Sequence, residues 1–170
     1  FMSGSAFIYY GEEIGMVAGG TTDPDKRAPM VWSDDGTGGI TTRPPGCTLP
    51  DGYPFGSLAQ QQEDPYSIYN YYRQVIAIRN AVSAISHGRT TVEAALNQGC
   101  ISAQRKTWGE ETCIILMNID PDGADVDLSA YKDWKVAACI CADGGEFMLD
   151  PESSIFSMPA YGIAVLLPAA

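Results

Sequence analysis

The fold of this chain is decided by residues 4–13, which read Gly4-Ser5-Ala6-Phe7-Ile8-Tyr9-Tyr10-Gly11-Glu12-Glu13. Within this stretch, residues 6–10 form a continuous apolar run between two glycines. Such a run is typical of a strand buried on both faces, as in a parallel sheet that is covered by helices. A strand of this kind needs neighbouring strands, so the sequence predicts that it belongs to a larger sheet.

The segments that follow this strand predict a long loop and then a helix. Residues 19–58 are rich in Gly, Pro, Thr and Asp and show no periodicity, which in a compact domain is typical of a functional loop. Asp64 and Pro65 supply a helix cap and a first-turn proline, and apolar residues then recur at helical spacing. We therefore expect a helix over residues 65–84, ended near Gly88.

Beyond Gly88 the pattern changes to short runs separated by turn residues. The turns at 108–111 and 120–123 contain the Gly, Pro and Asp that tight reversals favour. This series predicts an antiparallel β-sandwich, with a domain boundary between residues 1–87 and residues 88–170. The expected strands are residues 91–95, 100–107, 112–118, 124–128, 135–141, 153–157 and 163–167.

Composition excludes several classes of ligand. The chain has 170 residues and a formal net charge of −11, so its surface repels nucleic acid phosphates and anionic lipid headgroups. The glycines between residues 11 and 20 lack the spacing of nucleotide-binding loops, and the five cysteines form no zinc-type pairs. We expect no nucleic acid or membrane partner, no cofactor and no metal; a neutral substrate such as a sugar fits better.

Four ordered motifs resemble the α-amylase/α-glucosidase family, glycoside hydrolase family 13. Residues 4–13 resemble its eighth-strand signature, although Ala6 replaces a proline, and Arg27-Ala28-Pro29-Met30-Val31-Trp32 resembles the loop of its oligosaccharide-cleaving α-glucosidases. Residues 57–79 resemble its last barrel helix, and residues 112–120 and 159–162 resemble parts of its C-terminal sandwich. Such a combination is specific to few families.

The resemblance implies an α+β chain in which the remnant of a (β/α)8 barrel, namely its last strand, long loop and last helix, precedes an antiparallel β-sandwich. It also implies a C-terminal fragment of a retaining α-glycoside hydrolase that acts on α-glucans, short maltooligosaccharides or isomaltooligosaccharides. Such enzymes need two carboxyl groups about 5 Å apart. In the family these groups lie on earlier strands whose motifs are absent here, so we expect no catalytic residue in this chain and an inactive isolated fragment.

The loop after the eighth strand of such a barrel lies on the face that carries the active site. Asp23, Arg27 and Trp32 are therefore our candidates for lining the substrate pocket. A forked guanidinium can hold a carboxylate or sugar hydroxyls, but Arg27 could equally tie the loop down through a structural ion pair. Trp32 and Tyr53 could stack on sugar rings or anchor the loop by packing.

Other polar motifs are assigned structural roles. Gly4, Gly11 and Glu13 form the strand signature, and adjacent Glu12 and Glu13 point in opposite directions and cannot flank one bond. The aspartates of residues 120–127 lack the pattern of a calcium loop, which favours a hairpin turn. His87 is the only histidine and has no nucleophile elbow to serve.

Two further hypotheses remain open. The chain could be a carbohydrate-binding or interaction module without catalysis, with Trp108 and Trp134 as the available stacking residues of the sandwich. Because Phe1 is not an initiator methionine, we expect a piece of a longer protein, whose unpaired strand at residues 7–10 promotes self-association. The first residues do not resemble a secretion signal, which favours the cytoplasm.

Overall fold

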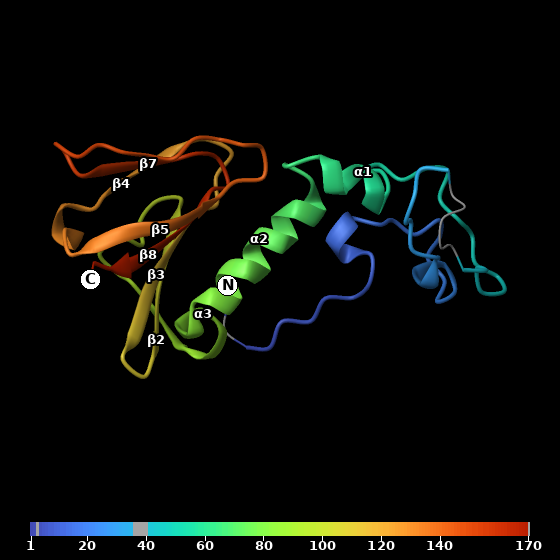
Figure 1. Cartoon of the computed structure of the whole chain (residues 1–170), viewed down its shortest axis with the longest axis horizontal. Helices are drawn as coiled ribbons and strands as arrows, with labels where there is room; N and C mark the ends of the chain where they lie inside the picture. The colour runs from blue at the N-terminus through green and yellow to red at the C-terminus, as the bar shows by residue number, and fades with distance from the viewer. Residues whose placement is uncertain (3, 36–40, 170) are drawn as a thin grey trace. The chain divides into compact units, whose positions relative to one another are not determined.

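The computed structural model describes residues 1–2, 4–35 and 41–169 (Figure 1). The chain divides into two compact units. One comprises Ala6–Arg73, and the other comprises Phe1–Ser5 together with Gln74–Ala170.

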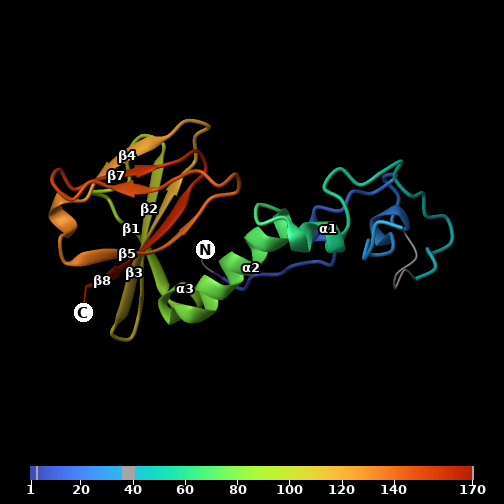
Figure 2. The same cartoon turned by 45° about the horizontal axis from the view of Figure 1, so that its top comes forward.

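The second unit contains two antiparallel sheets. One sheet has five strands in the order β1-β2-β3-β8-β5, and the other has three in the order β4-β7-β6. Figure 2 shows β4 and β7 in one layer and β1, β2 and β5 in the other. The predicted antiparallel sandwich is therefore confirmed. Its strands are β1 Arg89–Val92, β2 Ile101–Trp108, β3 Glu111–Asn118, β4 Ala124–Asp127, β5 Trp134–Ile140, β6 Met148–Leu149, β7 Ile155–Met158 and β8 Ile163–Pro168.

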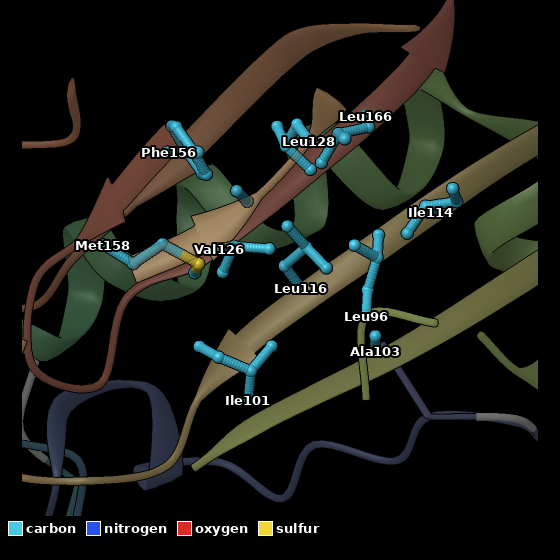
Figure 3. Close-up of a cluster of buried hydrophobic side chains, with 11 residues drawn as sticks. Leu96, Ile101, Ala103, Ile114, Leu116, Val126, Leu128, Phe156, Met158 and Leu166 are labelled. Carbon is cyan, nitrogen blue, oxygen red and sulfur yellow. The ribbon is translucent and has the colours of Figure 1, made fainter. Parts of the chain in front are cut away.

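The main hydrophobic core lies between the two sheets. Side chains from both sheets meet there, as Figure 3 shows. Leu116 and Leu166 come from the five-stranded sheet, and Val126, Phe156 and Met158 come from the three-stranded sheet. All five are buried, so the association of the sheets rests on this apolar contact.

A second core lies on the outer face of the five-stranded sheet. There, α3 (Ser83–His87) contributes Ala84 and Ile85, which cluster with Cys113 and Ile115 of β3 and with Val165 of β8. Because β3 is covered on both faces, its residues 113–116 are all buried. This coverage explains why β3 has a continuous apolar run where a one-sided strand would alternate.

The predicted strands occur within a few residues of their expected positions, with two differences. Residues 93–95 leave β1 because the backbone turns there, with the N–H of Leu96 donating to the carbonyl of Glu93 at 3.1 Å. The turn at residues 120–123 does not form a hairpin, since β3 and β4 lie in different sheets. The turn at 108–111 does form one, because Trp108 and Glu111 are paired across it.

The predicted helix over residues 65–84 is wrong at both ends. The structure has α1 at Leu58–Glu63, α2 at Ile68–Ala81 and α3 after a break at Val82, whose backbone is extended. Ser67 Oγ, rather than Asp64, accepts the N–H of Asn70 at 3.2 Å in the first turn of α2. Val82 is buried in the second core together with Ala84 and Ile85, and this packing accounts for the break.

Residues 6–10 do not form a strand, contrary to the sequence prediction. They are exposed along their whole length, and 91% of the surface of Phe7 is accessible. A strand requires partners for its backbone N–H and C=O groups, and the described part of the Ala6–Arg73 unit contains no strand that could pair with this one. In the described part of the loop region, short 3-10 helices lie at Glu12–Ile14 and Asp25–Arg27.

Among residues 1–2, 4–35 and 41–169, no helix combines the length and the apolar composition that a bilayer span requires.

Candidate functional site

A tight turn follows residues 6–10 and is closed by its own carboxylates. Gly11 has φ of 90°, and a Cβ atom there would lie 2.7 Å from Met16 Sδ, so the position requires glycine. Glu12 Oε2 accepts the N–H of Tyr9 at 3.2 Å, and Glu13 Oε2 accepts that of Gly11 at 2.8 Å. Both carboxylates are thus engaged with backbone groups of the turn. The assignment of Gly4, Gly11 and Glu13 to a family signature stays a prediction.

Asp25 is the buried anchor of the loop that follows. Its Oδ2 accepts hydrogen bonds from the N–H and the hydroxyl of Thr22 at 2.8 and 2.6 Å, and its Oδ1 accepts one from the N–H of Thr48 at 2.7 Å. The Thr22 hydroxyl and these backbone donors lower the pKa of Asp25 to about 2. The carboxylate therefore stays ionised and joins two parts of the loop that lie 23 residues apart.

Asp23 and Arg27 form a bidentate ion pair on the surface of the same loop. Arg27 Nε lies 3.1 Å from Asp23 Oδ2, and Arg27 Nη2 lies 3.2 Å from Asp23 Oδ1. The hydrogen bond and the charge of Asp23 raise the pKa of Arg27 above its ordinary value. Both side chains are exposed, at 60% for Arg27 and 73% for Asp23, so the pair remains accessible to a ligand or to another carboxylate.

The Arg-Ala-Pro-Met-Val-Trp stretch is connected to the start of α1. The carbonyl groups of Val31 and Trp32 accept the N–H groups of Leu58 and Ala59 at 2.9 and 3.2 Å. The first N–H groups of a helix have no partner within the helix, and these contacts satisfy two of them. These two hydrogen bonds therefore fix residues 31–32 of the loop against the first turn of α1.

Ser57 caps α1 and contacts the loop at the same time. Its Oγ accepts the N–H of Gln60 at 3.3 Å, and Gln60 Oε1 accepts the N–H of Ser57 at 3.0 Å, which together make a capping box. The Ser57 hydroxyl also donates to Asp34 Oδ1. Asp34 is thereby fixed beside the first turn of α1.

A cavity of about 380 Å³ lies between this part of the loop and α1. Its volume is within the range of small-molecule sites, ~300–1,000 Å³. Pro29, Val31 and Leu49 supply apolar surface, and polar groups come from Asp34, Tyr53 and Gln60. Burial raises the pKa of the Tyr53 hydroxyl, which therefore stays protonated and can donate a hydrogen bond. This mixture suits a neutral ligand that has both hydroxyl groups and apolar faces.

The structure brings only part of the predicted site together. Asp23 and Arg27 contact each other, whereas neither they nor Trp32 line this cavity. Trp32 is 45% exposed, and Tyr53 is the one aromatic candidate whose side chain borders the cavity. Whether Asp23, Arg27 and Trp32 contact substrate stays a prediction.

Sequence reasoning missed Asp25 and Asp34. Thr22 stands three residues before Asp25, a spacing at which a carboxylate commonly bonds backbone N–H groups, and this signal could have identified it. No local pattern could have identified Asp34, whose partner Ser57 is 23 residues away.

No three His, Cys, Asp or Glu side chains in the described ranges cluster so that they could hold a metal ion.

Comparison with known proteins shows which family this chain resembles. The sequence model described as the catalytic domain of alpha amylase matches residues 1–88. Alpha-amylase 3 of Dictyoglomus thermophilum is 40% identical over 91 residues, which cover 52% of this chain and 17% of that protein. The cyclomaltodextrinase of Geobacillus thermopakistaniensis is 28% identical over 165 residues, covering 96% of this chain and 23% of that protein.

Solved structures give the same family assignment. The chain is similar to Eubacterium rectale Amy13B with a TM-score of 0.88 and 33% identity, covering 99% of this chain and 32% of that one. It is similar to the alpha-amylase from H. orenii with a TM-score of 0.75 and 25% identity, covering 95% and 32%. The chain thus spans between about a sixth and a third of the length of these relatives.

These matches confirm the predicted architecture, a barrel remnant followed by an antiparallel β-sandwich. The catalytic-domain model covers more than half of the chain, and the motifs at residues 4–13 and 27–32 lie within that match. The chain belongs to the α-amylase family of glycoside hydrolases.

Proposed function

We propose that this chain forms the C-terminal part of a retaining α-glycoside hydrolase that acts on α-glucans or short malto- and isomaltooligosaccharides. The proposal rests on membership of the α-amylase family and on relatives named as an alpha-amylase, a cyclomaltodextrinase and a maltase. The contribution of the chain is to shape one wall of the substrate site and to support the barrel with a sandwich.

The observation that carries the proposal is the anchored loop beside the 380 Å³ cavity. Asp25 holds the loop at its start, and α1 holds it at Val31 and Trp32. The stretch between these anchors contains Arg27, whose guanidinium is paired but exposed. A loop fixed at both ends presents such groups without a large loss of entropy on binding, which is what a substrate wall requires.

Arg27 is proposed to orient substrate or a catalytic carboxylate in the whole enzyme. Its bidentate pairing with Asp23 fixes the plane of the guanidinium and leaves its remaining donors for sugar hydroxyls or a second carboxylate. An exposed ion pair of this kind adds little to stability, so a functional role for the pair is favoured.

The nucleophile and the acid/base are proposed to come from residues outside these 170. A retaining mechanism needs two carboxyl groups ~5 Å apart on either side of the scissile bond. Glu12 and Glu13 accept backbone hydrogen bonds within their own turn, and Asp25 is buried and fully hydrogen-bonded. These carboxylates are structural, so the isolated chain should not hydrolyse glycosides.

Two assays test the proposal. The purified chain is assayed with a nitrophenyl α-glucoside, and we expect no turnover; turnover would contradict the assignment of the catalytic carboxylates. In the second assay, this chain replaces the matching third of the alpha-amylase from H. orenii, and starch hydrolysis is measured. A folded chimaera that hydrolyses starch is expected, whereas a folded but inactive chimaera would contradict the proposed role.

A further inference from the structure

The sandwich has a cavity of its own at the edge where its two sheets part. β5 is the last strand of the five-stranded sheet and β6 is the last strand of the three-stranded sheet, and residues of both line a cavity of about 340 Å³. Trp134 and Val136 line it from β5, and Tyr131 lines it from the short 3-10 helix Ser129–Tyr131 that precedes β5. Leu149 and Glu152 line it from β6 and the turn that follows. No role described above uses this cavity.

The aromatic wall of the cavity is rigid. The rings of Tyr131 and Trp134 meet edge to face, with 6.5 Å between their centroids. The Tyr131 hydroxyl donates to Glu93 Oε1 at 2.8 Å, and Arg105 Nε donates to Glu93 Oε2 at 2.5 Å. The guanidinium of Arg105 lies 4.9 Å from the centroid of the Trp134 ring, so one network fixes both rings.

The hydrogen-bonding network of Glu93 and Arg105 lies outside the cavity lining. Glu93 and Arg105 hold the rings without lining the cavity themselves. Although desolvation raises the pKa of Glu93, the hydrogen bonds from Arg105 and Tyr131 outweigh it and keep the pKa lowered. The ion pair is therefore intact at neutral pH, and the rings are held in place before any ligand arrives. Preorganised rings cost a ligand little entropy on binding.

The rim of the cavity is polar and of mixed sign. Lys132 offers hydrogen-bond donors and Glu152 offers acceptors, and both side chains are exposed. The carboxylate oxygens of Asp150 accept the N–H of Glu152 and the hydroxyl of Ser153 at 2.9 and 2.5 Å and so hold the turn. Hydroxyl groups can satisfy both kinds of partner, whereas a charged ligand would be repelled by one of them. Apolar surface from Val136 and from the exposed Leu149 completes a lining that suits a ring with one apolar face and a hydroxylated edge.

We infer that this cavity binds a glucose unit of an α-glucan, stacked on Trp134, and so tethers the polymer to the sandwich. The identity of the sugar rests on the proposed function, while the existence of the site rests on the cavity. A proline-rich peptide also stacks on aromatic rings, but the mixed-charge rim favours a polyhydroxylated ligand.

The test measures binding of maltoheptaose to the 170-residue chain by calorimetry. Leu149→Arg places a charged side chain at the exposed mouth of the cavity, and we expect at least tenfold weaker binding. Met148→Arg is the matched control, because Met148 is the exposed neighbour in β6 and does not line the cavity. It should bind as the unaltered chain does.

A second pair of variants removes the ring itself. Trp134→Ala should abolish binding, and Trp134→Phe should retain part of it, because the phenyl ring still offers a stacking face. Trp108→Ala is the control, since Trp108 is exposed and lies outside the cavity. Circular dichroism of each variant establishes that the sandwich is folded.

Three outcomes would overturn the inference. The first is the absence of maltoheptaose binding by the unaltered chain at concentrations up to ~10 mM, the range of a weak sugar site. The second is binding that persists in Leu149→Arg but is lost in Tyr53→Ala, which would place the sugar in the loop cavity and support the proposed function alone. The third is Trp134-dependent binding of oligoproline in place of the sugar.

Discussion

Lys106 and Arg79 donate hydrogen bonds to the same acceptor, the carbonyl oxygen of Ile85, at 3.1 and 3.3 Å. Lys106 is fully buried and also donates to the carbonyl of Met2 at 3.3 Å. These acceptors are neutral, and a second cation lies nearby. Desolvation and, to a lesser degree, the charge of Arg79 lower the pKa of Lys106 below its ordinary value of 10.5.

This lowered pKa gives a pH-dependent contribution to stability. At pH values between the folded and the ordinary pKa, the unfolded state binds more protons, so the stability of the native chain rises with pH in that range. We predict that Lys106→Met, which removes the buried charge, is as stable as the native chain or more stable at pH 7. The difference in the free energy of unfolding between this variant and the native chain should shrink as the pH approaches 10.5. Urea unfolding at pH 7, 8, 9 and 10 measures the difference; a difference that does not change with pH contradicts the prediction.

Asn118 joins the end of β3 to two turns. Its Nδ2 donates to the carbonyls of Asp122 and Pro159 at 2.7 and 2.9 Å, and its Oδ1 accepts the N–H of Asp120 at 3.1 Å. Asn118→Leu leaves these groups unpaired, and we expect a loss of ~1–3 kcal/mol in the free energy of unfolding. Asn80→Leu, at an exposed position of α2, should change stability by less than ~0.5 kcal/mol. Equal effects of the two substitutions would exclude a bridging role for Asn118.

The Asp25 anchor can be tested without altering Asp25. A Cβ atom at Gly20 would lie 2.4 Å from Asp25 Oδ2, which cannot move away without losing its hydrogen bonds to Thr22. Gly20→Ala should therefore destabilise the loop by ~1–3 kcal/mol. Faster hydrogen exchange at the amides of Thr22 and Thr48 would report this change.

Gly52→Ala is the control for that substitution. A Cβ atom at Gly52 has no neighbour within 4 Å among the described residues, and its backbone is not left-handed. We expect unchanged exchange at Thr22 and Thr48. If both alanine variants accelerate exchange alike, the anchor does not depend on the contact between Gly20 and Asp25.

The exposed run at residues 7–10 should drive self-association. It presents apolar side chains and backbone groups that make no strand pairing in the described chain. We predict dimers or larger species in light scattering, and a monomer after Phe7→Glu, because an added charge opposes burial of the run. Tyr66→Glu, which alters a single exposed aromatic residue elsewhere, should leave association unchanged. A monomeric native chain would contradict the prediction.

The sandwich was predictable because its signals are local. The apolar run of β3 and the glycine of the 108–111 turn each specify one strand or one reversal, and neither requires knowledge of distant partners. The two-residue strand β6 is too short to leave a pattern in the sequence.

The helices and the loop depended on tertiary contacts. No Gly or Pro stands at the break at Val82, so the sequence gives no signal for it. The break follows from the packing of Val82 against the outer face of the five-stranded sheet. The Asp25 anchor needs Thr48, and the cap of α1 contacts Asp34, each across 23 residues. Residues 6–10 have the composition of a strand, but composition cannot supply the partner strands that would satisfy their backbone.

The position of β8 between β3 and β5 has a consequence for biosynthesis. β3 ends at Asn118, and its second neighbour begins only at Ile163. At translation rates of ~5–20 residues per second, a few seconds pass between the synthesis of β3 and that of β8. During this time the edge of β3 that later pairs with β8 has no partner strand. During that interval Ile114 and Leu116 lack the contacts that β8 later supplies, and the free edge of β3 can pair with another chain.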